Sequence, residues 1–336
     1  MEITMPFRRI SALIVFAAPL LLGAQTTPRW IIGGEDDAVT QLGRVRAVVA
    51  LSRSFVVLER DAPFLKVFDY SGRLLQTLGR SGAGPGEYRG PTSLSFDERN
   101  QRLLVVDPSN ARVTAYQVRD SLVAPRFLKV GDSGIRSVCA LGTRLIGLAR
   151  NAPTILRELR EEGGKLTVTG SFGEPRTNHP LGTHPMVRTR ASDGPLLCDE
   201  QGNRVIVASA MLGEVHVFDA SSRQLVTTPI PGFQRITMIV EDSALTMVPP
   251  VGGYHVVHGL VPWEGSVRVV TERLRPMPGD APMSVGFAFA GIGAGGPGAL
   301  GARTQWRPLA KTSSGALCAQ EDPAPAIALF TAGSCP

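Results

Sequence analysis

The sequence predicts an all-β fold, a six-bladed β-propeller made of four-stranded antiparallel blades and closed by an N-terminal strand. Three observations predict it. Short apolar strands alternate with turns rich in Gly, Asp and Asn, the pattern recurs with a period in the low forties, and a further apolar strand precedes the first repeat. A single blade cannot bury both of its faces, so the repeats are expected to seal one another in a ring.

Residues 1–24 have the pattern of a signal peptide. Arg8 and Arg9 precede an apolar run of about 14 residues, which is too short to span a bilayer comfortably. We expect cleavage after Ala24; the alternative is a buried N-terminal helix. No later segment is apolar for long enough to cross a membrane, so residues 25–336 are expected to form one soluble propeller domain that is periplasmic or secreted.

Five copies of the repeat align at the turn between their first two strands. Their aligned positions are 46, 43, 59 and 42 residues apart, at Ala50, Phe96, Cys139, Cys198 and Val240. Third strands that end in Phe-Asp are visible at residues 64–72 and 214–222, and an outer strand at residues 74–79. This spacing is typical of propeller blades.

The two ends of the chain complete the predicted ring. The short apolar stretch at residues 29–34 is expected to be the outer strand of the last blade, which removes the exposed sheet edges. Residues 287–336 contain only five charged side chains and are rich in Gly, Ala and Pro. They predict an irregular last blade or a partly disordered tail, and a shifted reading frame is a third interpretation.

Residues 67–116 carry the most specific motifs. They contain VFDYSGR at 67–73, GRSGAGPGEY at 79–88 and VVDPSNARV at 105–113. This stretch resembles the NHL-repeat family and related bacterial six-bladed propellers, strongly over about 50 residues and loosely over about 200. The resemblance implies a closed six-bladed ring. The functions in this family range from protein and RNA binding to lyase and lactonase activity. The fold alone therefore does not identify the function of this chain.

The motif residues are expected to connect blades. Gly82, Gly84 and Gly86 would supply positive φ where the chain passes to the next blade, and Pro85 would stiffen the crossing. Asp107 and Asn110 would cap the turn between the second and third strands. Strand parity places this turn and the loop between blades on one rim, called the loop face below. That rim is expected to hold Glu87, Tyr88, Arg89, Asp107, Asn110 and Arg112, with Arg112 paired to Asp107 or a neighbour.

The longest spacing between repeats reflects an insertion over residues 173–194, also on the loop face. Long insertions on a rigid scaffold often carry binding residues. We expect this loop to overhang the channel mouth and to contact an anionic or carbonyl-rich partner, and the alternative is a tolerated surface insertion. The candidate binding residues are Arg176, His179, His184, Arg188 and Arg190, with Tyr88 and Arg89 beside them.

The sequence assigns no catalytic residue, metal site or cofactor. His255 and His258 would point to opposite sides of a strand, His216 is expected to be packed, and His179 with His184 is a weak metal signal. The acidic residues near loops form no recognisable set. No nucleophile elbow, P-loop or dinucleotide motif occurs in a fitting context.

The charge distribution bears on the kind of partner that the chain binds. The net charge is +6, and the arginines that dominate it are scattered, so a solvated surface is favoured over nucleic-acid binding.

Cys139 and Cys198 occupy the same position in two neighbouring repeats. They either bridge neighbouring blades or pack as small apolar groups, and packing is favoured because inner strands diverge. Cys318 and Cys335 could close a loop near the C-terminus.

These observations favour an exported, non-catalytic propeller that binds a protein, peptide or glycan through its loop face and is monomeric. The alternative is a metal-dependent, lactonase-like hydrolase or lyase with its site at the channel mouth. Such an enzyme needs at least three polar side chains that converge on the axis. RNA binding is a third possibility, which export disfavours.

Overall fold

The structure is a computed structural model that describes residues 27–34, 41–131, 134–150, 154–174, 177, 179–191, 193–222, 224–241, 244–293, 296–320, 324–331 and 335–336. The predicted signal peptide and Arg176 lie outside these residues. Among the described residues, no helix has both the length and the apolar character that a membrane crossing requires.

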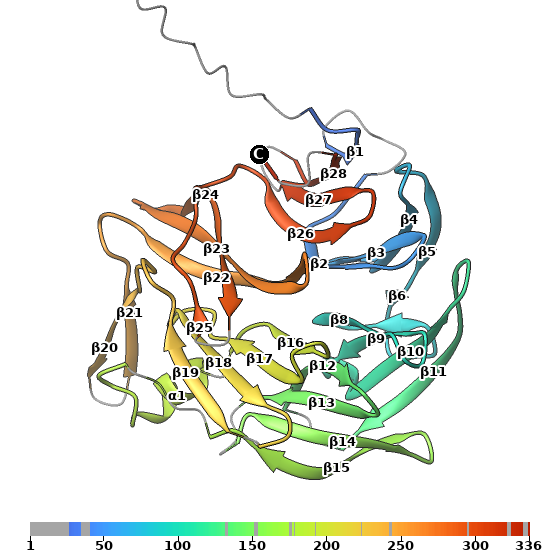
Figure 1. Cartoon of the computed structure of the whole chain (residues 1–336), viewed down its shortest axis with the longest axis horizontal. Helices are drawn as coiled ribbons and strands as arrows, with labels where there is room; N and C mark the ends of the chain where they lie inside the picture. The colour runs from blue at the N-terminus through green and yellow to red at the C-terminus, as the bar shows by residue number, and fades with distance from the viewer. Residues whose placement is uncertain are drawn as a thin grey trace, which may run out of the picture.

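Figure 1 shows four-stranded blades arranged around a central axis, which confirms the predicted propeller fold. A short parallel pairing of residues 129–130 with residues 165–166 joins blades two and three into one eight-stranded sheet. Blade one comprises β2 (Val45–Ala50), β3 (Ser54–Glu59), β4 (Leu65–Asp69) and β5 (Leu74–Leu78), and blade two comprises β8 (Ser93–Asp97), β9 (Arg102–Asp107), β10 (Arg112–Val118) and β11 (Leu122–Val130). Blade three comprises β12 (Ile135–Leu141), β13 (Arg144–Ala149), β14 (Leu156–Glu162) and β15 (Lys165–Phe172).

The second half of the ring follows the same plan. Blade four comprises β16 (Leu196–Asp199), β17 (Arg204–Ala208), β18 (Glu214–Asp219) and β19 (Leu225–Pro229), and blade five comprises β22 (Tyr254–Trp263), β23 (Ser266–Met277), β24 (Asp280–Gly293) and β25 (Gly296–Pro297). Blade six comprises β26 (Arg307–Thr312), β27 (Gly315–Gln320), β28 (Ala326–Phe330) and β1 (Trp30–Gly33). Apolar clusters fill the spaces between neighbouring blades, so each sheet is sealed by the next.

The ring closes as the sequence predicts. β1 pairs antiparallel with β28, in the register Trp30↔Leu329 to Gly33↔Ala326, and is the outermost strand of blade six. The two ends of the chain therefore share one sheet, which pairs an edge that would otherwise be open.

The fifth predicted repeat is misplaced. Residues 240–248 belong to a separate hairpin of β20 (Thr237–Glu241) and β21 (Ala244–Val248), whereas the first turn of blade five follows Trp263. Any two-stranded hairpin has the same strand–turn–strand pattern, and the expected spacing was met by chance.

The C-terminal stretch also differs from expectation. Residues 287–293 belong to β24, and β26 to β28 form regular, paired strands rather than an irregular blade or tail. Ala316 to Ala319 are completely buried. The few charges in this stretch reflect burial of both faces of the sheet.

Both cysteine pairs form disulfides. Cys139 in β12 bonds Cys198 in β16, with Cα atoms 5.7 Å apart, so the favoured expectation of simple packing is wrong. The inner strands of neighbouring blades converge at the axis closely enough for the bond, with a Cα separation inside the normal disulfide range. Cys318 bonds Cys335 near the C-terminus.

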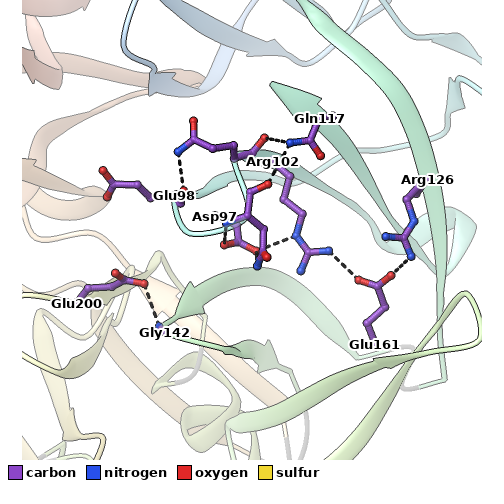
Figure 2. Close-up of polar contacts among 10 residues, drawn as sticks. Asp97, Glu98, Arg102, Gln117, Arg126, Gly142, Glu161 and Glu200 are labelled. Carbon is purple, nitrogen blue, oxygen red and sulfur yellow. Dashed lines mark hydrogen bonds and ion pairs between the residues drawn. The ribbon is translucent and has the colours of Figure 1, made fainter. Parts of the chain in front are cut away.

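A polar network ties blades two, three and four together on the face opposite the loop face, called the turn face below (Figure 2). Arg102 donates to Asp97 at 2.7 Å within blade two and to Glu161 of blade three, also at 2.7 Å. Glu161 also pairs with Arg126, and Glu200 of blade four accepts a hydrogen bond from the Gly142 amide at 2.9 Å. These side chains pair with one another or with backbone and thereby fix the blades.

Candidate functional site

A central cavity of about 490 Å³ lies on the axis, and all six innermost strands or the residues just before them line it. Each contributes two side-chain positions that are two residues apart and therefore face the same way. The layer nearer the loop face is Arg46, Thr92, Arg136, Gly194, His258 and Arg307. The next layer is aliphatic and consists of Val48, Leu94, Val138, Leu196, Leu260 and Leu309.

β-Bulges set the direction of three polar side chains in this lining. The register of β2 with β3 skips Arg46, that of β12 with β13 skips Arg136, and that of β22 with β23 skips His258. A bulge redirects the extra residue and is common beside binding sites. The same irregularity at the same place in three blades directs these residues to one cavity.

Two of the lining arginines already have acidic partners or neighbours. Arg150 pairs with Asp193, which also contacts Arg190 at 3.4 Å. Arg307 is buried and donates to the Val45 carbonyl at 3.1 Å. Glu272 is the acidic neighbour of Arg307. Burial alone would raise the pKa of Glu272, but hydrogen bonds from His258, at 2.5 Å, and from Ser284 lower it. Together with the nearby charge of Arg307, these bonds hold the pKa below its usual value.

Arg46 and Arg136 differ from these. Both are exposed, and neither forms an ion pair with any described residue. Arg46 donates to the Pro91 carbonyl of blade two at 2.9 Å, which holds its guanidinium at the rim. The cavity therefore presents two unneutralised cations, from blades one and three, to the solvent.

Ser93, Ser137 and Arg150 lie along the same wall, but the two hydroxyls and the Arg150 Nε atom are closed to solvent and have no hydrogen-bond partner among the described residues. A buried polar atom without a partner costs roughly 1–3 kcal/mol. Because water cannot reach these atoms, a ligand in the cavity would not contact them either.

The sequence motif at residues 79–92 meets the turn at residues 107–112, as strand parity implies. Asp107 accepts hydrogen bonds from the Arg89 and Gly90 amides at 3.1 and 3.2 Å, and Asn110 donates to the Gly82 carbonyl at 3.0 Å. These side chains hold the loop between the blades, and Asn110 also donates to the Asp107 carboxylate at 2.8 Å across their own turn. The expected side-chain to backbone bonds within that turn are not among these contacts. η1 (Pro108–Asn110) has no side-chain cap at Asp107.

The arginine and glycines of the motif also differ in detail. Arg112 donates to the carbonyls of Ala83 and Gly84 at 3.2 and 3.1 Å and to the Glu87 carbonyl, and does not pair with Asp107. Gly82 and Gly86 adopt positive φ and Gly84 does not. The Gly84 amide instead donates to the Glu87 carboxylate at 2.7 Å. Pro85 lies within this turn, between Gly84 and Gly86.

Tyr88 is fully buried, and its hydroxyl lies 2.9 Å from that of Tyr116. Burial raises the pKa of its phenol. A side chain packed between blades one and two cannot contact a ligand, so Tyr88 no longer belongs among the candidate binding residues. Arg89 beside it is exposed.

The predicted insertion contains α1 (Pro185–Ala191), which packs against the β20–β21 hairpin around Val187, Ile236 and Met238. Figure 1 shows these elements toward the outside of the ring. Of the insertion's described residues, only those from Asp193 onward line the cavity, so α1 does not overhang the mouth.

The candidate binding residues of the insertion differ in their contacts. The Nδ1 atoms of His179 and His184 accept hydrogen bonds from the Leu181 and Met186 amides at 3.1 and 3.3 Å. The two imidazoles therefore stabilise turns. Arg188 is exposed, and Arg190 contacts Asp193 as described above.

Sequence reasoning missed Arg46, Arg136, Arg150 and Arg307. Aligning the starts of the inner strands would have placed three of them in one column. The misassigned fifth repeat kept His258 out of that column, and bulges leave no clear sequence signal. Within the described ranges, no three His, Cys, Asp or Glu side chains lie close enough together to hold a metal ion.

A family model described as a 6-bladed beta-propeller, DUF5128, matches residues 35–130. No curated protein matches the sequence. The structure is similar to a DUF4221 family member from Bacteroides vulgatus, with TM-score 0.52 and 6% identity over 89% of this chain and 95% of that one. It is also similar to a protein of unknown function from Bacteroides thetaiotaomicron, with TM-score 0.53 and 13% identity over 89% and 73%.

A third similar structure is U3-55K, with TM-score 0.51 and 10% identity over 90% of this chain and 98% of that one. At these identities the likeness concerns the propeller fold alone. The finer resemblance to NHL repeats stays a prediction.

Proposed function

We propose that this chain is an exported, monomeric, non-catalytic propeller that binds a protein, peptide or glycan through its loop face. The observation that carries the proposal is the cavity, whose layer nearest that face is rich in arginine. Basic groups at a concave mouth attract and orient acidic ligands.

The segments around the cavity support binding on this face. α1 and the β20–β21 hairpin are insertions between blades, and they share a small apolar cluster of their own. Exposed Arg89 and Arg188 add positive charge to the same face. Insertions that are packed onto a rigid scaffold are suited to partner recognition.

The lactonase-like alternative has less support. More than three polar side chains do converge on the axis, as such an enzyme would need. A divalent metal, however, needs several oxygen or nitrogen ligands, and beside three hydroxyl residues the described lining provides Asp193 and His258 among four arginines. The arginines would repel a cation at the mouth. No observation on the loop face favours nucleic acid over another acidic partner.

The binding proposal is tested with glycan and peptide arrays probed by the labelled full chain. We expect binding to acidic members, reduced by Arg89→Ala with Arg188→Ala. The matched control is Arg99→Ala, which removes an exposed arginine from the turn face. An array without bound members, or equal loss in the control, would contradict the proposal.

Export is tested separately by expressing the chain with its own N-terminus in a Gram-negative host. We expect a periplasmic or secreted product that begins near Gln25. A cytoplasmic product that retains Met1 would contradict export, and would make RNA the next partner to test.

A further inference from the structure

We propose that the central cavity binds a small organic polyanion with at least two carboxylate groups, held by Arg46 and Arg136. This inference rests on the proposed binding function and specifies the ligand of its central site. It is carried by two features of the lining: unneutralised charge and an aliphatic second layer.

The charges come first. Arg46 and Arg136 lie at equivalent bulges in blades one and three, while Asp193 already pairs with Arg150 and contacts Arg190. The remaining charge at the mouth is therefore positive. An arginine guanidinium donates two parallel hydrogen bonds to a carboxylate, so two arginines on separate blades suit a ligand with two such groups.

The aliphatic layer comes second and points to an organic ligand. Val48, Leu94 and Leu260 of this layer are half-buried, whereas Val138 is only 2% exposed and belongs to the core. A carbon skeleton between the carboxylates would contact the half-buried side chains, whereas inorganic phosphate or sulfate would leave them against water. The cavity volume of about 490 Å³ is within the range of small-molecule sites.

The experiment is isothermal titration calorimetry of the full chain at low ionic strength. The probes are propane-1,2,3-tricarboxylate, butyrate as a monocarboxylate of similar skeleton, and inorganic phosphate. We expect the tricarboxylate to bind at least tenfold more tightly than butyrate or phosphate, because only it can engage both arginines and the aliphatic layer. Raising the salt concentration should weaken its binding.

Variants then locate the site. Arg46→Gln and Arg136→Gln should each weaken tricarboxylate binding roughly tenfold or more, since each removes a charge-assisted pair. Arg99→Gln, the same change on the turn face, should leave it unchanged. Thermal unfolding of both arginine variants should match that of the unchanged chain, which separates ligand contact from a structural role.

The outcomes separate this inference from the broader proposal. If no tricarboxylate binds while array partners do, the inference is overturned and loop-face binding stands. Tighter binding of phosphate than of the tricarboxylate, or equal weakening by Arg99→Gln, also overturns it. Tricarboxylate binding through Arg46 and Arg136 without any array partner supports the inference and contradicts the macromolecular partner.

Discussion

The two faces of the ring use arginine in opposite ways. On the turn face, Arg102 lies between Asp97 and Glu161 and links blade two to blade three. On the loop face, Arg46 and Arg136 lie at the cavity without an acidic partner among the described residues. The same residue type thus joins blades on one face and remains available to a ligand on the other.

This difference separates structural arginines from candidate binding arginines. A paired charge with a buried partner stabilises the fold, since its removal leaves that partner uncompensated. An exposed arginine without a counter-ion contributes little to folding, so its removal should affect ligand binding more than stability. Variants on the two faces should therefore affect different measurements.

The largest effect on stability is expected from Arg102→Leu. The change leaves the Asp97 side chain, which is 1% exposed, without its ion-pair partner. We expect a loss of roughly 3–5 kcal/mol in the free energy of unfolding, measured by urea denaturation. Ligand binding by the remaining folded protein should be unchanged; a normal stability would show that the turn-face network is not structural.

The disulfide between blades three and four should come next. Cys139→Ser with Cys198→Ser releases a crosslink that spans 59 residues. We expect a loss of about 2–4 kcal/mol in the free energy of unfolding, because the unfolded chain regains entropy. Thermal unfolding of the two proteins gives the comparison, and equal stability in oxidised and variant protein would contradict the bridge.

His255 tests whether the loop face also carries a structural group. Burial, with the charges of Arg273 and Arg303, lowers the pKa of this imidazole to about 4. The unfolded chain then binds more protons than the native state between about pH 4 and 6.5, so stability is complete above this window and falls as pH drops through it, by roughly 1 kcal/mol per pH unit.

The pH test compares this chain with His255→Asn, whose side-chain oxygen could still accept from the Gln234 amide that now donates to His255 at 2.8 Å. Urea denaturation between pH 4 and 7 should show a shallower dependence in the variant. Identical slopes would remove His255 as the cause.

The smallest effect is expected from Arg53→Ala. Arg53 and Asp120 form an ion pair whose side chains are 87% and 97% exposed. Water screens such a pair, so neither stability nor ligand binding should change measurably. A clear change in melting temperature would show that exposed pairs contribute more here than the comparison of the faces assumes.

The ring could be predicted from the sequence because strands at near-constant spacing indicate repeated blades. The apolar strand at residues 29–34, which becomes β1, indicated how the ring closes. It failed at residues 240–248, where a hairpin outside the blades has the same local pattern as a blade. It also failed at Tyr88, because a tyrosine at a blade crossing can face either the solvent or the neighbouring sheet.

The cavity could be predicted only in part. The insertion over residues 173–194 was singled out from its length, and its end at Asp193 lines the cavity. Arg46 and Arg136 were not recognised because they reach the axis through bulges, which depend on strand register rather than residue type. Arg46 and Arg136 are far apart in the sequence, and only the pairing of the strands shows that both lie at the same cavity.

A crystal structure of the full chain grown with propane-1,2,3-tricarboxylate tests the central claim most directly. The account predicts the anion in the axial cavity, with separate carboxylates on Arg46 and Arg136 and its carbon atoms against the half-buried Val48 and Leu94. An anion bound elsewhere at saturating concentration, with the cavity filled only by water, would contradict it.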